Sequence, residues 1–322
     1  MNSGHTWALV LAAGDGSRLQ SLTRIAGDIA VPKQFCSLRG GPSLLHEALR
    51  RAEAVADRER ICTVVAQQHR CWWETALRSM PAANVIVQPE NRGTANGILL
   101  PLLHIMERDP DARVVLLPSD HYVRDEATLA RFMQNAVAEL QTHGSEVILL
   151  GIEPDEVDPE LGYIVPRGDP GAPVSRVERF VEKPSATVAR ELLLQGALWN
   201  VFIVAAHAQA LLELFMMRFP QVVADMSVVV AHDAGDPMQP AAAARLYRTL
   251  PTIDFSRQIA QGSESALRVL RVPPCGWSDL GTPKRVAETL RRVPAPPVPA
   301  EPYFPCPGHL NLAARQALLG AG

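Results

Sequence analysis

Short apolar runs alternate with amphipathic stretches along the first half of the chain. Five runs have the length and the β-branched content of buried strands, at 8–12, 60–66, 84–88, 112–117 and 146–151. Four intervening segments place apolar residues at helical spacing, at 44–55, 68–80, 94–108 and 126–143. Parallel strands need crossover connections of this kind, so the alternation predicts a mostly parallel sheet covered by helices on both faces.

The second half of the chain shows the same two patterns less regularly. Strand-like runs lie at 163–166, 174–181, 197–205 and 266–272. Helix-like runs lie at 207–218, 221–232, 239–249 and 282–292, and Ser185 is placed to cap a further helix. We therefore predict the α/β class: a three-layer αβα, Rossmann-like fold with a predominantly parallel mixed sheet.

The chain shows no internal repeat and no clear linker before Pro294. This predicts one domain over residues 1–293. Residues 294–322 form a proline-rich tail, expected to be extended, with a short apolar helix near 311–319.

Composition excludes several classes of protein. Hydrophobic residues make up 47% of the chain, charged residues 20%, and the net charge is −3, so nothing favours nucleic acid or an anionic membrane as a partner. No apolar run reaches the ~20 residues of a membrane span, and the N-terminus lacks the basic region of a signal peptide. The 5 cysteines form no CxxC pair, which argues against a zinc site and for a reducing, cytoplasmic location.

A glycine-containing loop follows the first predicted strand. Gly14 and Gly16 lack a Cβ, so their N–H groups can approach a polyanion closely. Arg18 and Lys33 add cations suited to phosphates. The loop alone supports a tight turn as well as it supports a nucleotide site.

Two aspartates follow predicted strands at distant places in the chain. Asp120 lies just past a buried strand, where open α/β sheets place their ligand crevice. Asp279 lies between Gly276 and Gly281. Carboxylates at strand ends are good Mg²⁺ ligands, although either residue could equally form a cap or turn. His121 is better suited to orient the turn than to react.

Three further segments end strands with polar residues. Gln88 can pair with a base edge, and Gly93 allows a planar ring to approach the backbone, if this is more than a capped loop. Glu182 and Lys183 suit sugar hydroxyls and a sugar phosphate, although a solvated Glu–Lys pair is the commoner case. Asn200 lies inside an apolar strand, where it needs a partner that a ligand hydroxyl could supply.

These segments together resemble a known family, the sugar-nucleotide pyrophosphorylases. The motifs, in chain order, are LAAGDGSR, PKQF, QPENRGTA, LLPSDH, LGYI, FVEKP, LWN and GWSDLGT. Five segments are most similar to the mannose-1-phosphate guanylyltransferase branch of this family: NRGTA, PKQF, SDH, TIDF and GWSDLG. The resemblance runs from about residue 7 to 292.

The resemblance implies a nucleotidyltransferase fold, a Mg²⁺ cofactor, and GTP and mannose 1-phosphate as substrates, giving GDP-mannose and pyrophosphate. A homodimer is also compatible with it. It implies catalytic roles for Arg18, Lys33 and Asp120, with Asp120 and Asp279 as metal ligands. Nucleotide binding would fall to Ala13, Gly14, Gly16, Gln88, Asn91, Gly93 and Thr94, and sugar-phosphate binding to Gly162, Glu182, Lys183 and Asn200.

The chain departs from the family pattern in three ways. The loop usually reads GGSGTRLWPLSR, whereas this chain has AGDGSRLQSLTR, with Asp15 inside the phosphate loop. About four extra residues precede Lys33, which makes this connector a candidate lid. Val201 and Phe202 replace the usual Ser-Gly. These departures leave the identity of the sugar undecided and, to a lesser degree, the identity of the base. There are two alternatives. The protein could carry out the same reaction on another sugar 1-phosphate or nucleotide, or it could be a non-catalytic homologue that binds nucleotide sugars.

Overall fold

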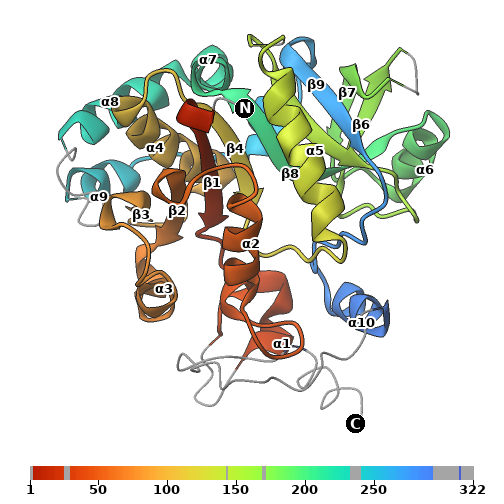
Figure 1. Cartoon of the computed structure of the whole chain (residues 1–322), viewed down its shortest axis with the longest axis horizontal. Helices are drawn as coiled ribbons and strands as arrows, with labels where there is room; N and C mark the ends of the chain where they lie inside the picture. Colours follow the sequence, from red (N-terminus) through yellow and green to blue (C-terminus); the bar gives the residue numbers. More distant parts are fainter. Residues whose placement is uncertain are drawn as a thin grey trace.

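The structure is a computed structural model that describes residues 3–24, 30–142, 144–168, 172–232, 241–292 and 312. Within this part of the chain, nine strands form one sheet in the order β3-β2-β1-β4-β8-β5-β9-β7-β6 (Figure 1). The strands are β1 (Thr6–Ala12), β2 (Ile61–Ala66), β3 (Val85–Gln88), β4 (Arg113–Pro118), β5 (Val147–Ile152), β6 (Gly162–Arg167), β7 (Val174–Glu182), β8 (Leu198–His207) and β9 (Leu267–Val272).

Helices fill the connections between the strands. They are α1 (Gln20–Thr23), α2 (Leu44–Ala52), α3 (Arg70–Ala76), α4 (Gly93–Arg108), α5 (Glu126–Glu139), α6 (Ala186–Leu194), α7 (Ala208–Arg218), α8 (Pro220–His232), α9 (Ala241–Tyr247) and α10 (Pro283–Arg292). Every strand and helix expected before residue 293 is present, with ends shifted by a few residues. The short helix α1 and a π-helical turn at Ser256–Ala260 had no counterpart in the sequence pattern.

The two halves of the sheet differ in strand direction. β3, β2, β1 and β4 run parallel, and so do β5 and β9. β8 lies between β4 and β5 and is antiparallel to both. β6 and β7 add antiparallel pairings at the far edge. The α/β class with a mixed sheet is therefore confirmed, and its antiparallel pairings all involve β6, β7 or β8.

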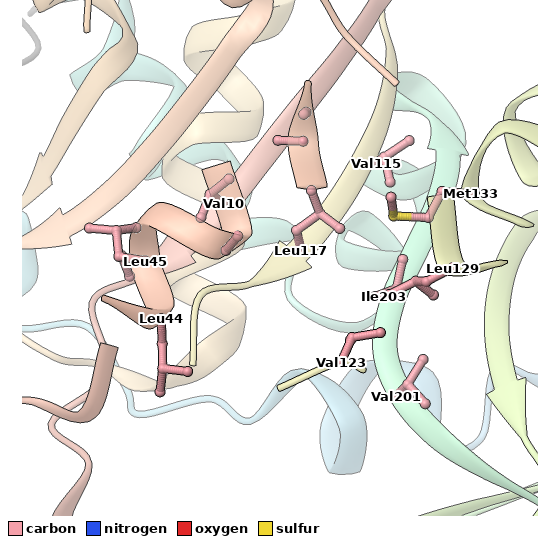
Figure 2. Packing of buried hydrophobic residues seen from close by; sticks show 14 of the residues in the cluster. Val10, Leu44, Leu45, Val115, Leu117, Val123, Leu129, Met133, Val201 and Ile203 are labelled. Carbon is pink, nitrogen blue, oxygen red and sulfur yellow. The ribbon is translucent and has the colours of Figure 1, made fainter. Parts of the chain in front are cut away.

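Apolar side chains cover both faces of the sheet, as in a three-layer fold. One core joins the sheet to α2 and α5, where Leu45, Val115 and Met133 pack (Figure 2). The other core joins the opposite face to α4, α7 and α8, with Ile98 and Leu211 fully buried. The uninterrupted burial of the central strands explains why they read as continuous apolar runs.

Helix starts agree with the capping residues in the sequence. Ser43 and Ser185 each accept a hydrogen bond from the N–H three residues later, at the starts of α2 and α6. Asp125 does the same for α5. These caps satisfy N–H groups that have no partner within the helix, and so fix where each helix begins.

The predicted tail at 294–322 lies outside the described residues, except for Leu312. That residue is fully buried in the core beside α2, and its N–H donates to the carbonyl oxygen of Ser37 at 3.0 Å. Part of the connector expected as a lid, residues 25–29, also lies outside the described part. No helix of the described residues is long and apolar enough to cross a membrane.

Candidate active site

A pocket of about 320 Å³ lies at the carboxyl ends of β1, β3 and β4 and reaches the ends of β6, β7 and β8. Parallel strands end at the same edge of a sheet, so the loops that follow β1 and β4 meet there. Ser119 marks the meeting point, because its N–H and hydroxyl both donate to the carbonyl of Leu11. The predicted residues that line this pocket are Ala13, Gly14, Arg18, Gln88, Asn91, Gly93, Thr94, Asp120, Gly162, Glu182, Lys183, Asn200 and Asp279.

The glycine loop is held from behind by a residue that the site prediction omitted. The buried amide of Gln34 donates to the carbonyl oxygens of Ala12 and Gly14, at 2.9 and 3.0 Å. Gly16 adopts φ +60°, and a Cβ there would lie 3.1 Å from the backbone nitrogen of Lys33. Gly16 is thus required by the close approach of the PKQF segment, whereas Gly14 faces the pocket.

Asp15, the unexpected acidic residue of this loop, is bound by neighbouring polar groups. Its carboxylate accepts hydrogen bonds from Asn91 at 2.9 Å and from Gln68 at 3.2 Å. His69 Nε2 lies 3.4 Å away, and burial lowers the pKa of His69 although Asp15 opposes this. Asp15 therefore ties the glycine loop to the loop after β3.

Arg18 and Lys183 converge on one carboxylate inside the pocket. Glu160 Oε2 lies 3.2 Å from Arg18 Nη1 and 3.8 Å from Lys183 Nζ. All three residues line the pocket. The two cations thus lie close enough together to bind the same anionic ligand.

Lys33 lies behind the pocket wall, between the two aspartates. Its ammonium is buried and lies 2.9 Å from Asp120 Oδ2, and it donates to the carbonyl oxygen of Asp279 at 2.6 Å. Burial acts to raise the pKa of Asp120, but the attraction and hydrogen bond of Lys33, together with His121 and a backbone hydrogen bond, hold that pKa below its usual range. Neither Lys33 nor Gly16 is among the residues that line the pocket.

The loops that carry the two aspartates are joined by backbone and side-chain bonds. Tyr122 and Ser278 exchange two N–H···O bonds of 2.9 Å in an isolated antiparallel bridge. The indole N–H of Trp277 donates to His121 Nδ1 at 3.2 Å. Burial lowers the pKa of His121 to about 4, so the ring is neutral near pH 7. His121 therefore orients the turn, which agrees with its expected structural part.

Asp279 is also held by a buried arginine. Its Oδ1 accepts from Arg285 and from the N–H of Gly281, both at 3.0 Å. Burial acts to raise the pKa of Asp279, but Arg285, His121, Lys33 and the N–H of Gly281 together lower it. The same guanidinium bonds Asp158, so Asp279 stays ionised within a network of fixed charges.

The two aspartates offer a donor set that suits Mg²⁺. Lys33 lies nearest one oxygen of Asp120, and Arg285 bonds one oxygen of Asp279, so each carboxylate keeps a second oxygen for a metal. Among the described residues, no group of three or more His, Cys, Asp or Glu could hold an ion. Mg²⁺ commonly uses one or two carboxylates together with water and substrate phosphates, so the residues fit a metal that arrives with its substrate.

Gln88 leaves a buried acceptor at the β3 end of the pocket. The side chain is 2% exposed, and its Oε1 has no hydrogen-bond partner in the described structure. A buried amide without a partner costs free energy that a bound ligand can recover. Gly97 keeps this end open, since a Cβ there would lie 3.2 Å from Gln88 Oε1.

Gly93 and Thr94 are joined to a distant segment, the TIDF stretch. Gly93 adopts φ +84°, and a Cβ there would collide with the carbonyl of Ile253. Thr94 Oγ1 accepts the N–H of Phe255 at 2.8 Å, and Asn91 Oδ1 accepts the N–H of Gly93 at 3.0 Å. The glycine is therefore required by the packing of protein backbone, in addition to any ligand.

The β7 end of the pocket places a carboxylate beside a strained lysine. Burial and the repulsion of Asp254 raise the pKa of Glu182 to about 7. A Cβ at Gly162 would overlap the Glu182 carboxylate, so this glycine makes room for it. Lys183 adopts φ +49°, a conformation that L-residues rarely take.

Asn200 has a protein partner for one end of its amide. Its Oδ1 accepts the N–H of Phe202 at 3.1 Å, where β8 shifts register against β5. The predicted need for a partner inside a strand is therefore met partly by the protein, and the residue also lines the pocket.

Several residues that line or support this pocket were not predicted from the sequence. Gln34 and Trp277 lie inside motifs that were read for Lys33 and Asp279, and Glu160 directly precedes LGYI. Asp254 and Ser256 also line the pocket, and the TIDF segment was the only signal for them. Each lies within or beside a quoted motif, so reading whole motifs would have found them.

The chain is similar to known proteins over most of its length. The sequence profile of the nucleotidyl transferase family matches residues 7–294. The alginate biosynthesis protein AlgA of Pseudomonas syringae pv. tomato is 28% identical over 85% of this chain and 56% of its own length. Mannose-1-phosphate guanylyltransferase of Escherichia coli K12 is 30% identical over 62% of this chain and 42% of its own length. The chain thus spans about half the length of the curated relatives it matches.

Solved structures share the fold. The mannose-1-phosphate geranyltransferase of Thermus thermophilus superposes with a TM-score of 0.74 at 25% identity, over 90% of this chain and 80% of that one. A UDP-glucose pyrophosphorylase complexed with UDP-glucose has a TM-score of 0.55 at 14% identity, over 89% and 98% of the two chains. These likenesses confirm the three-layer αβα fold predicted from the sequence.

Proposed function

The chain belongs to the nucleotidyl transferase family, and from this premise we propose that it joins GTP to mannose 1-phosphate, giving GDP-mannose and pyrophosphate. An oxygen of the sugar phosphate attacks the α-phosphorus of the nucleotide. The bond from that phosphorus to the β-phosphate oxygen breaks, and pyrophosphate leaves. The observation that carries the proposal is that one pocket is lined by residues from all eight of the quoted motifs.

The nucleotide occupies the end formed by the loops after β1 and β3. The backbone around Gly14 binds its phosphates together with Arg18. Gln88 supplies a buried acceptor beside a donor, which matches a base edge that presents the complementary pair. An amide alone does not select the base, so guanine is assigned from the relatives named as guanylyltransferases.

The sugar phosphate occupies the end formed by β6, β7 and β8. Glu182 and Asn200 face the sugar hydroxyls, and Lys183 faces the phosphate. Arg18 belongs to the nucleotide end of the pocket and Lys183 to the sugar-phosphate end. Both cations lie close to the carboxylate of Glu160 and therefore close to each other. The attacking and accepting phosphates would meet there.

The reaction needs little proton transfer. A phosphate monoester has a second pKa of about 6, so the attacking oxygen is already ionised at pH 7. The barrier lies in the repulsion of two anions and in their alignment, which fixed cations and a shaped pocket reduce. Mg²⁺, when bound by Asp120 and Asp279, would neutralise phosphate charge. Lys33 holds both aspartates in place.

The rival interpretations are the same chemistry on another substrate pair and a homologue that only binds nucleotide sugar. The second rival is disfavoured because binding alone would not need four charged residues together at the site. These are Arg18, Lys33, Asp120 and Asp279. The substrate panel below separates the first rival from the proposal.

A substrate panel tests the proposal. The protein is incubated with each nucleoside triphosphate and each common sugar 1-phosphate, and pyrophosphate release is measured. We expect the largest kcat/KM for GTP with mannose 1-phosphate. A clear preference for UTP or dTTP would contradict the guanylyl assignment.

Two variants test the assigned roles. Asp120→Ala and Lys33→Ala should each lower kcat by about 100-fold or more, since each removes charge at the reacting phosphates or its support. Gln68→Ala, on the outer side of Asp15, serves as the control with near-normal turnover. Unchanged turnover in both site variants would exclude the mechanism.

A further inference from the structure

Three non-glycine residues of the described structure have a left-handed backbone, and two of them line the pocket. They are Lys183 (φ +49°), Phe202 (φ +58°) and Leu280 (φ +46°). Lys183 and Phe202 line the pocket, and Leu280 follows Asp279. Such strained positions gather at functional sites, where the surrounding structure holds them.

Phe202 is the most informative of the three, because a bulky side chain rarely takes this conformation. A glycine would adopt φ +58° without strain. The phenyl ring must therefore contribute enough to offset the strain. Its surroundings show what it contributes.

The ring separates a core from the pocket. Val201 and Ile203 point into the core that faces α5 (Figure 2), and Phe202 lies on the opposite face of β8. There it meets Phe255 edge to face, with ring centroids 6.1 Å apart. Phe202 is only partly buried, and the rest of its surface forms pocket wall.

The backbone at this position also fixes a polar neighbour. Asn200 Oδ1 accepts the Phe202 N–H at 3.1 Å, so the left-handed turn sets the direction of the Asn200 amide. The remaining amide N–H₂ of Asn200 keeps its donors for a ligand. Position 202 therefore gives the pocket a fixed donor and a rigid apolar wall side by side.

From this juxtaposition, and resting on the proposed function, we propose that Phe202 is a specificity-determining residue that limits the size of the sugar. The wall stands beside Asn200, which is assigned to the sugar hydroxyls, and it lines the same pocket as Lys183. We place the C2 substituent at this wall, because C2 is bonded to the phosphate-bearing carbon and the phosphate is assigned to Lys183. Phe202 admits a hexose with a C2 hydroxyl and rejects the bulkier C2 acetamido group.

The test compares kcat/KM for mannose 1-phosphate and N-acetylmannosamine 1-phosphate, both with GTP. In Phe202→Gly the preference for the hydroxyl sugar should fall about tenfold or more, which is the size of effect that shape selection in a pocket supplies. Phe202→Ala should behave similarly, because it also removes the ring. The KM for GTP should stay within about twofold of the wild-type value. If another sugar proves to be the substrate, the same hydroxyl and acetamido pair is used on that sugar.

Two control variants separate the wall from general packing. Phe202→Leu keeps the apolar bulk and should keep the preference. Ile203→Val, on the other face of β8, should lower the urea midpoint of unfolding without changing the preference. An unchanged preference in folded Phe202→Gly and Phe202→Ala, or a change in the KM for GTP alone, would overturn the proposal.

A binding measurement distinguishes this proposal from the proposed function. Calorimetric titration with each sugar 1-phosphate gives the ratio of dissociation constants without turnover. If no substrate pair releases pyrophosphate but Phe202→Gly still lowers this ratio, the proposed activity fails and the role of Phe202 stands. If turnover occurs and neither ratio changes, the activity stands and the role of Phe202 fails.

Discussion

At the scale of single residues, burial and nearby charge set what each polar group can do. Asp279 is buried and Asp120 is partly buried, yet the pKa of each is lowered, because Lys33 and Arg285 act together with His121 and backbone N–H groups against the effect of burial. Glu182 has no such excess of cations, and its pKa rises instead. The carboxylates of this pocket therefore titrate in different pH ranges: the pKa values of Asp120 and Asp279 are lowered, and that of Glu182 is raised.

Glu182 should give the protein a measurable pH dependence. Its pKa is raised from 4.5 to about 7, so between these values the folded state binds more protons than the unfolded chain. The free energy of unfolding should therefore fall as the pH rises from 4.5 to 7, and Glu182→Gln should flatten this fall. The ionised carboxylate accepts sugar hydroxyls, so wild-type affinity for the sugar phosphate should increase through pH 7.

Urea unfolding and calorimetric titration at a series of pH values measure both effects. Glu178→Gln, on the solvent side of the same strand, is the control and should follow the wild-type profile. Matching profiles for the wild type and Glu182→Gln would show that Glu182 titrates elsewhere.

At the scale of secondary-structure elements, the loops after β1 and β3 use glycine for different reasons. Gly14 is exposed, and a Cβ there would meet no described atom within 4 Å. Gly93 has φ +84° and lies against the backbone of Ile253. Only the second glycine is required by the protein alone.

This difference makes Gly14→Ala and Gly93→Ala a matched pair. Gly14→Ala should change the free energy of unfolding by less than about 0.5 kcal/mol but raise the KM for the nucleotide, because a methyl group enters the space of the phosphates. Gly93→Ala should lower that free energy by about 2 kcal/mol, through strain and a backbone collision. Thermal unfolding and steady-state kinetics measure the two effects. A wild-type KM for the nucleotide in Gly14→Ala would show that the phosphates do not bind at this loop.

The elements themselves could be predicted because each buried strand is a continuous apolar run and each helix carries a periodic face. Strand order could not, since β8 reads as an apolar run whichever neighbours it has. The site residues could be predicted where motifs reach strand ends. The partners of Asp15, Lys33 and Asn200 could not, because they depend on contacts between residues far apart in sequence.

At the scale of the whole molecule, one buried arginine joins three distant segments. Arg285 in α10 bonds Asp158, between β5 and β6, and Asp279, between β9 and α10. Its guanidinium also lies over the Trp199 ring of β8, with 5.4 Å to the ring centroid. The last described helix is thereby fixed to the candidate active site.

Arg285→Met should lower the free energy of unfolding by about 3 kcal/mol at pH 7, because it leaves two mostly buried carboxylates without their cation. Arg285 holds the pKa of Asp279 below its usual range, so this loss should shrink as the pH falls below about 4. Arg292 lies on the same helix as Arg285 and forms an exposed ion pair with Asp155. Arg292→Met should lower the free energy of unfolding by less than about 1 kcal/mol. Urea unfolding of both variants at pH 7 and at about pH 3, below the ordinary pKa of an aspartate, measures the difference. Equal losses at both pH values would contradict the ionic account.

The place of β8 in the sheet also determines when the chain can fold. β4 and β5 are separated by a strand that is synthesised about 50 residues after β5, and the other neighbour of β5, β9, comes later still. A nascent chain that ends before β8 therefore has an apolar strand, β4, with one open edge, and β5 has no partner at all. Such edges pair readily with other chains. These edges are covered only after β8 has been synthesised, so slow translation of the segment between α5 and β8 lengthens the period in which they can pair with other chains.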